Sequence, residues 1–207
     1  MEAVLDVYAR PYDVAHPVVC LDEKRKQLVG ETRAPFTDSE GVRYIDYEYE
    51  RAGVGVLYMV CEPLGGRREA RVEASQDRLA WARTVVHMAE TMYPEAERIT
   101  LVQDNLSAHK PSALYEILAP ERARAVLRRL EIVYTPKHGS WLNIAELELS
   151  VLSKQSLDRR IGSAAELVQI VTSWSRARTA AQQGVDWQFR TEDARVKLKY
   201  LYPSYIS

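Results

Sequence analysis

The chain has 207 residues, of which 46% are hydrophobic, so it can form one sizeable core and requires no second domain. Its 28 Lys and Arg residues balance 29 Asp and Glu residues, and this formal net charge of −1 predicts no particular partner. No apolar stretch approaches the length of a membrane span, and the N-terminus is too polar for a signal peptide. Cys20 and Cys61 each lie in an apolar run, which indicates buried free thiols in a reducing compartment. We therefore expect a cytoplasmic protein whose residues 1–207 form a single domain.

The first third of the chain predicts an antiparallel meander. The expected elements are a helix over 2–9, strands over 16–22, 44–50, 54–61 and 67–72, and a charged loop at 23–26 that follows Asp22. The strand at 44–50 is expected because polar and apolar residues alternate there. A turn signal, Pro63 to Gly66, predicts that 67–72 returns as the hairpin partner of 54–61.

The rest of the chain alternates helices with strands. The expected elements are a helix over 75–92 capped by Ser75, a strand over 99–103, a helical segment broken at Pro120 and a strand over 132–134. Two helices are then expected, over about 143–157 and 163–181. The C-terminal part, 163–207, is expected to be helical and to end in a basic tail over 191–202. Such alternation favours parallel pairing. The whole order predicts an α/β, ribonuclease H-like fold, in which helices flank a mixed five-stranded sheet.

Three acidic residues fall where this sheet would bring them together. Asp22 ends the first strand, Asp104 ends the strand at 99–103, and Glu146 lies in the first turn of the helix near 143. Three carboxylates in one pocket repel one another unless a cation compensates them. Oxygen ligands of this kind select Mg²⁺ or Mn²⁺, and two such ions would activate a nucleophile and stabilise the leaving oxygen of a phosphodiester. The pattern indicates phosphoryl transfer on nucleic acid.

Each of these residues also has an ordinary structural explanation. Aspartate commonly bonds to turn backbone where a strand ends, and an acidic residue favours a helix N-terminus. Four neighbours could support the acids: Asn105, His109, His138 and Asn143. A loop histidine can contact phosphate or pair with a metal ligand, although it is more often solvated.

Glu146 and Glu148 compete for the role of third acid. They point roughly 200° apart on a helix, so one metal site cannot readily use both. Glu146 shares a polar stripe with Asn143, Ser150 and further polar residues, whereas Glu148 falls on the apolar arc. We therefore predict that Glu146 faces the pocket and that Glu148 pairs with a basic residue or lies at an exposed edge.

Local basic clusters are the candidates for contact with DNA. They comprise Lys24, Arg25, Lys26, Lys137, Lys154, Arg159 and Arg160. Runs of this kind are most often solvated faces. If they flank the acids, they would bind phosphates weakly, without regard to base sequence and with strong dependence on salt.

Three motifs resemble the catalytic core of a bacterial insertion-sequence transposase, in the family numbered 630 of the mariner superfamily of DDE enzymes. They are VVCLDE at 18–23, LVQDNLSAH at 101–109 and YTPKHGSWLNIAELELSVLSKQSLDRRI at 134–161. The resemblance continues through the tail VDWQFRTEDARVKLKYLYPS and so covers nearly the whole chain.

The resemblance implies a metal-binding triad of Asp22, Asp104 and Glu146 with Mg²⁺ or Mn²⁺ as the cofactor. It implies cleavage at element ends, transfer of a 3′-hydroxyl into target DNA, usually at TA, and action as a homodimer in synapsis. It also implies a bacterial, nucleoid-associated protein without membrane contact or organic cofactor. Two features depart from the family: the preceding helix-turn-helix region is missing, and the second and third acids are farther apart than is familiar. A non-catalytic DNA-binding or oligomerising fragment and another ribonuclease H-like endonuclease remain as alternatives.

Overall fold

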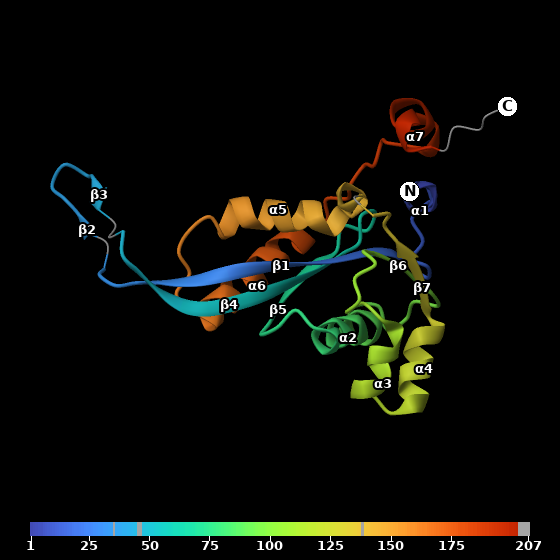
Figure 1. Cartoon of the computed structure of the whole chain (residues 1–207), viewed down its shortest axis with the longest axis horizontal. Helices are drawn as coiled ribbons and strands as arrows, with labels where there is room; N and C mark the ends of the chain where they lie inside the picture. The colour runs from blue at the N-terminus through green and yellow to red at the C-terminus, as the bar shows by residue number, and fades with distance from the viewer. Residues whose placement is uncertain (35, 45–46, 138, 203–207) are drawn as a thin grey trace.

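A mixed five-stranded sheet forms the centre of the molecule (Figure 1). The computed structural model describes residues 1–34, 36–44, 47–137 and 139–202. In spatial order the strands are β5 (Arg68–Glu73), β4 (Tyr49–Cys61), β1 (Val18–Glu31), β6 (Ile99–Gln103) and β7 (Leu130–Tyr134). β1, β4 and β5 pair antiparallel, whereas β6 is parallel to β1 and β7 is parallel to β6. This arrangement confirms the predicted ribonuclease H-like fold.

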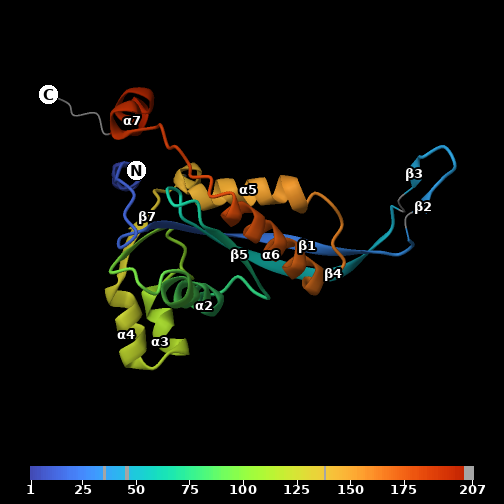
Figure 2. The same cartoon turned by 180° about the vertical axis from the view of Figure 1, so that it is seen from behind.

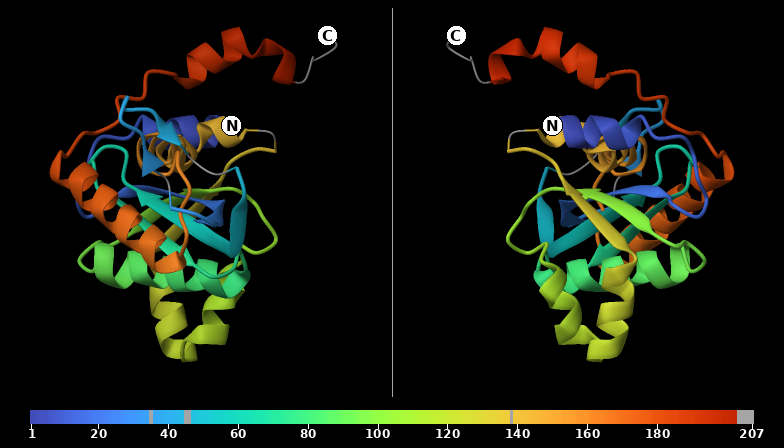
Figure 3. Two further views of the ribbon diagram at one scale, coloured as in Figure 1. Left: turned by 90° about the vertical axis from the view of Figure 1, so that its left-hand side faces the viewer. Right: turned by 90° about the vertical axis from the view of Figure 1, so that its right-hand side faces the viewer.

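Helices cover both faces of the sheet and make three layers (Figure 3). One face carries α1 (Glu2–Tyr8), α5 (Ile144–Ser156) and α6 (Ala164–Ala180), and the other carries α2 (Arg78–His87), α3 (Leu114–Ile117) and α4 (Pro120–Arg128). Short turns are the π-helical η1 (Met88–Met92) and the 3₁₀ helices η2 (Pro111–Ala113), η3 (Ser140–Leu142) and η4 (Lys199–Leu201). α7 (Thr191–Lys197) lies beside α1, to which Arg195 is joined by an ion pair with Glu2. Helix α4 begins at Pro120, the residue that was predicted to break this helical segment.

The period of two in the strands explains the two cores. In β1, Val18 and Cys20 pack under α5, whereas Val19 and Leu21 pack against α2 on the other face. Both faces are therefore closed by apolar contacts. Cys20 and Cys61 are buried free thiols, as predicted.

A long arm, made of β1 beyond Asp22 and the part of β4 that pairs with it, differs from the sequence-based expectation at two strand boundaries. β1 continues through residues 23–26, which were expected to form a loop, and reaches Glu31, because it stays paired with β4 along most of the arm. The arm projects from the body and ends in the small hairpin of β2 (Phe36–Thr37) and β3 (Arg43–Tyr44) (Figure 1). Apart from the buried Leu28, residues 22–31 of β1 are exposed or partly exposed, and their charged residues resemble a loop in sequence. The strand expected over 44–50 is also wrong, because β3 ends at Tyr44, residues 47–48 are not in a strand and β4 begins at Tyr49; residues 45–46 lie outside the described residues.

The start of α2 corrects a third expectation. The cap is Asp77 rather than Ser75, since the Asp77 carboxylate accepts hydrogen bonds from the backbone N–H groups of Leu79 and Ala80. Ser75 supports this cap, because its hydroxyl donates to Asp77 Oδ2 over 2.5 Å. Two polar residues so close together could not be distinguished by periodicity alone.

Helix α6 covers the edge strand β5 (Figure 2). The Thr179 hydroxyl accepts from Arg68 N over 3.0 Å and donates to Arg68 O over 2.8 Å, while the Ser175 hydroxyl accepts from Ala70 N over 3.0 Å. Side chains of a helix thus satisfy backbone groups that a sheet edge leaves open. Within the described part of the chain, no helix is both long and apolar enough to cross a membrane.

Candidate active site

The three predicted acids line one cavity of about 320 Å³ at the junction of β1, β6 and α5. Its walls are formed by Asp22, Glu23, Lys24, Asp104, Thr135, Ser140, Asn143, Glu146, Leu149 and Ser150. Four acidic residues and one lysine are therefore among its lining residues. The polar stripe predicted for α5 faces it through Asn143, Glu146 and Ser150.

Strand register places Asp22 beside Asp104. Cys20 of β1 pairs with Val102 of the parallel strand β6, and each acid lies two residues further along its own chain. Side chains two residues apart in extended chain share a face, so both carboxylates are directed to the side that α5 covers. Asp22 does not end its strand, contrary to expectation, because β1 continues beyond it.

Asn143 fixes the start of α5 against β1. Its side-chain amide donates to the Leu21 carbonyl over 2.9 Å, and its side-chain oxygen accepts from Ala145 N over 3.2 Å. One side chain thus caps the helix and ties it to the residue before Asp22. Glu146 follows in the first turn, where the helix dipole favours a negative charge.

The surroundings of the cavity disfavour having all of its carboxyl groups ionised at once. Burial raises the pKa of Asp22 to about 7, and repulsion from Glu23, Asp104 and Glu146 adds to this rise, although a hydrogen bond from the Glu23 backbone N–H opposes it. Glu146 Oε2 is buried and has no hydrogen-bond partner among the described residues. A buried carboxylate oxygen without a partner is costly, so this cavity favours a cation or a proton.

His109, predicted as a supporting residue, lies against the second acid. Its Nδ1 is 2.6 Å from Asp104 Oδ1, and its Nε2 is 3.2 Å from Glu23 Oε2. Burial lowers the pKa of His109, but the contacts with Asp104 and Glu23 outweigh burial and raise this pKa to about 9. Glu23 was not among the predicted site residues, and its one signal in the sequence is its position directly after Asp22.

Another predicted supporting residue is not brought to the acids, because Asn105 is exposed and does not line the cavity. His138, also predicted, lies outside the described residues. Among the described residues the supporting set is therefore His109 and Asn143, with Glu23 added.

Glu148 confirms the prediction that it pairs with a basic residue. It is buried, and its carboxylate lies 2.8 Å from Arg68 Nε and 3.2 Å from an Arg178 guanidinium nitrogen. These partners belong to β5 and α6, on the far side of α5 from the cavity. Glu148 therefore fastens α5 to its neighbours, while Glu146 remains directed to the cavity.

Several of the predicted DNA-contacting cations are engaged within the fold. Lys26 donates to the carbonyls of Leu157 and Arg159 over 2.7 and 3.2 Å, where α5 ends. Arg160 pairs with Glu31 over 2.5 Å at the end of β1, and Arg25 donates to Gln76 over 2.8 Å.

The other predicted cations remain at the surface. Lys24 lines the cavity and donates to the Ser153 hydroxyl over 3.0 Å. Lys154 and Arg159 line an open hollow between α5 and α6, and Lys137 is exposed. These four residues, rather than the whole predicted set, form a basic border beside α5.

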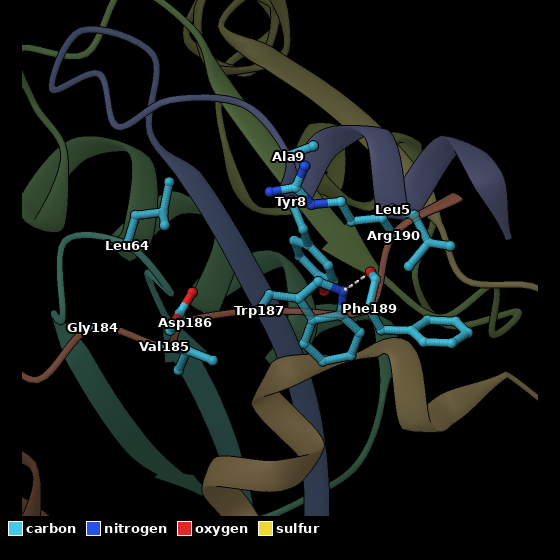
Figure 4. Close-up of a pocket in the computed structure, with 10 residues that line it drawn as sticks. All are labelled: Leu5, Tyr8, Ala9, Leu64, Gly184, Val185, Asp186, Trp187, Phe189 and Arg190. Atoms are coloured by element: carbon cyan, nitrogen blue, oxygen red, sulfur yellow. Dashed lines mark hydrogen bonds between the residues drawn. The ribbon is translucent and has the colours of Figure 1, made fainter. Parts of the chain in front are cut away.

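A larger cavity of about 510 Å³ lies elsewhere, between α1 and residues 184–190 (Figure 4). Aromatic rings dominate it, and the Trp187 indole nitrogen donates to the Phe189 carbonyl over 2.7 Å. Asp186 is the sole carboxylate among its lining residues. Its chemistry therefore does not match phosphoryl transfer, and the smaller acidic cavity remains the candidate site.

Among the described residues, no three His, Cys, Asp or Glu side chains already stand in an arrangement that could hold a metal ion. The donor set nevertheless suits a hard cation, because three carboxylates line one cavity and the Glu146 oxygen lacks a partner.

The chain matches one family model and several solved structures. A family model described as DDE superfamily endonuclease matches residues 17–168. Among solved structures, the Mos1 mariner paired-end complex with Mn matches with a TM-score of 0.54 at 17% identity, over 85% of this chain and 52% of that one. The Mos1 transposase paired-end complex with the left transposon end gives a TM-score of 0.55 at 16% identity, over 85% and 52%. The Mos1 strand transfer complex gives 0.54 at 17%, over 88% and 52%.

The chain thus spans about half the length of these Mos1 chains, and at this identity the likeness shows the fold. A search of the curated proteins found no match. The family model spans well over half of the sequence and includes all three acids. The chain therefore belongs to the DDE superfamily endonucleases.

Proposed function

We propose that this chain is the catalytic domain of a DNA transposase, related to the insertion-sequence family numbered 630 of the mariner superfamily. It would cleave DNA strands at element ends and transfer the exposed 3′-hydroxyl into target DNA. The observation that supports this most strongly is the meeting of Asp22, Asp104 and Glu146 in one cavity. Their equivalence to the family triad rests on the resemblance of the surrounding motifs.

Asp22, Asp104 and Glu146 would together hold two Mg²⁺ or Mn²⁺ ions. Such ions, when bound, polarise the phosphodiester, activate a water or 3′-hydroxyl and stabilise the leaving oxygen. Asp22 and Asp104 contribute carboxylates from adjacent strands, and Glu146 contributes one from the facing helix. Asn143 keeps that helix in place through the Leu21 carbonyl. Lys24, at the rim, can bind a phosphate oxygen of the strand that enters.

DNA is the proposed partner, through both element ends and target sites, with TA as the proposed target dinucleotide. The basic border of Lys24, Lys137, Lys154 and Arg159 beside α5 supports this proposal. Lys26 and Arg160 would contribute less, because Lys26 donates to two backbone carbonyls and Arg160, paired with Glu31, is only 27% exposed, whereas Arg159, paired with Glu166, is 57% exposed. Arg25 would also contribute less, because it donates to Gln76 and does not line the acidic cavity. Recognition of particular end sequences would need a further region, such as the helix-turn-helix that precedes the core in the family.

A homodimer during synapsis is also part of the proposal. The projecting arm exposes aromatic side chains at its tip, where Phe36 and Tyr44 stack at 4.9 Å and Tyr47 is 86% exposed. Large apolar side chains gathered on a projection are typical of a contact surface. The proposed setting is a bacterial cytoplasm, in association with the nucleoid.

Nicking of supercoiled plasmid tests the proposal. In Mn²⁺ the wild-type chain is expected to relax the plasmid, EDTA is expected to stop the reaction, and Asp104→Ala is expected to lose it, because the variant removes one proposed ligand. The readout is the fraction of nicked circles on an agarose gel.

Equal nicking by wild type and Asp104→Ala would contradict the proposed site. Plasmid binding without any nicking by the wild type would favour the non-catalytic alternative.

A further inference from the structure

His109 is enclosed between two carboxylates. Its side chain is 1% exposed, with Asp104 Oδ1 at 2.6 Å from Nδ1 and Glu23 Oε2 at 3.2 Å from Nε2. Consecutive residues of an extended strand point to opposite faces, so Asp22 and Glu23 leave β1 on different sides. Glu23 thereby reaches the histidine from the side that α2 covers.

Other side chains also hold His109 and Glu23 in place. The His109 ring stacks on Trp81 of α2 at 5.9 Å with 21° between the planes, and the Trp81 indole nitrogen donates to Gln103 Oε1 over 2.9 Å. Gln76 donates to Glu23 Oε1 over 2.8 Å. Glu23 thus receives a hydrogen bond from Gln76 on Oε1 and lies at ion-pair distance from His109 through Oε2, which suits a residue that holds His109 in place better than a metal ligand.

Asp104 is engaged on one oxygen only. Oδ1 is buried against His109, yet the side chain as a whole keeps 32% exposure. The exposed area thus belongs to the rest of the side chain, which includes Oδ2, and Asp104 lines the acidic cavity. His109 Nδ1 thus lies against Oδ1 at ion-pair distance and within 3.4 Å of the Asp104 backbone carbonyl, and it leaves Oδ2 for the cavity.

We propose that Glu23 and His109 are positioning residues, which orient Asp104 so that Oδ2 is presented to the cavity as a ligand. This inference rests on the proposed function, because it concerns how a proposed metal ligand is held. Close polar partners of a ligating carboxylate hold its orientation, and their loss typically lowers metal affinity about 10–100-fold.

The two ring nitrogens allow matched substitutions at one position. In asparagine the amide nitrogen lies near the place of Nδ1, so His109→Asn keeps a donor for Asp104. In glutamine it lies near the place of Nε2, so His109→Gln keeps a donor for Glu23 and loses the contact with Asp104. The readout is the Mn²⁺ dissociation constant of the full chain, from the electron paramagnetic resonance signal of free Mn²⁺, with thermal unfolding measured in parallel.

His109→Gln is expected to raise the Mn²⁺ dissociation constant about 10–100-fold, and His109→Asn is expected to raise it less. Glu23→Gln, which keeps the shape of the side chain, is expected to give an intermediate rise with little change in unfolding. The control is His87→Gln: His87 forms a comparable pair with Glu69, at 2.7 Å, that does not line the cavity. This control is expected to bind Mn²⁺ as the wild type does.

Wild-type affinity in His109→Gln, or equal losses in the Asn and Gln variants, would overturn the positioning role. Failure of the proposed function would look different. In that case the wild type would bind no Mn²⁺, or Asp104→Ala would bind it as tightly as the wild type.

Discussion

Glu146→Gln is expected to abolish Mn²⁺-dependent nicking and to leave the fold intact. Glu146 lines the acidic cavity, and its Oε2 is buried without a partner, so little in the fold depends on its charge. Glutamine keeps the volume and removes the negative charge that a cation would require. Loss of several kcal/mol of transition-state stabilisation corresponds to a rate reduction of about 10³-fold or more. Initial nicking rates and far-ultraviolet circular dichroism measure the two parts of this prediction.

Glu148→Gln is the matched control, because it makes the same change two residues away on the same helix. Glu148 points away from the cavity, toward Arg68 and Arg178. Its variant should therefore nick DNA at nearly the wild-type rate under conditions where it is folded. If Glu148→Gln lost activity and Glu146→Gln kept it, the third ligand would move to Glu148 and the match to the family motif would fail.

The largest effect on stability is expected for the same Glu148→Gln substitution. The side chains of Arg68 and Glu148 are only 2% and 6% exposed, and glutamine would leave the Arg68 guanidinium buried without a counter-charge. Breaking a buried ion pair on one side typically costs about 3–5 kcal/mol in the free energy of unfolding. Urea denaturation should show a lower midpoint with an unchanged slope.

An exposed ion pair provides the comparison for this stability prediction. Glu116 lies 2.8 Å from Arg78, but the two side chains are 42% and 60% exposed. Glu116→Gln should therefore leave the urea midpoint close to that of the wild type, because an exposed ion pair is screened by solvent. A similarly small loss in Glu148→Gln would show that the buried pair does not fasten α5 to β5 and α6.

The sequence predicted those elements whose pattern is set by burial. β6 lies at the expected residues, 99–103, because both of its faces are covered and all five of its residues are buried. The meeting of Asp22 with Asp104 was also predictable, since adjacent parallel strands place equivalent positions side by side.

The arm, and the contacts that Glu23 and Glu148 make, were not predictable from the local sequence pattern. β1 is stabilised beyond Asp22 by its pairing with β4 rather than by an apolar face, so its charges were interpreted as a loop. Glu23 gains its role from His109, and Glu148 from Arg178; both contacts join distant parts of the sequence. A period in the local sequence carries no information about such partners.

Mn²⁺-soaked crystals would show whether Asp22, Asp104 and Glu146 form one metal site. The measurement is the anomalous difference density of manganese. We expect a peak in the acidic cavity, within coordination distance of oxygens from all three side chains. Manganese bound elsewhere, or three carboxyl groups that remain too far apart to share an ion in the soaked crystal, would contradict it.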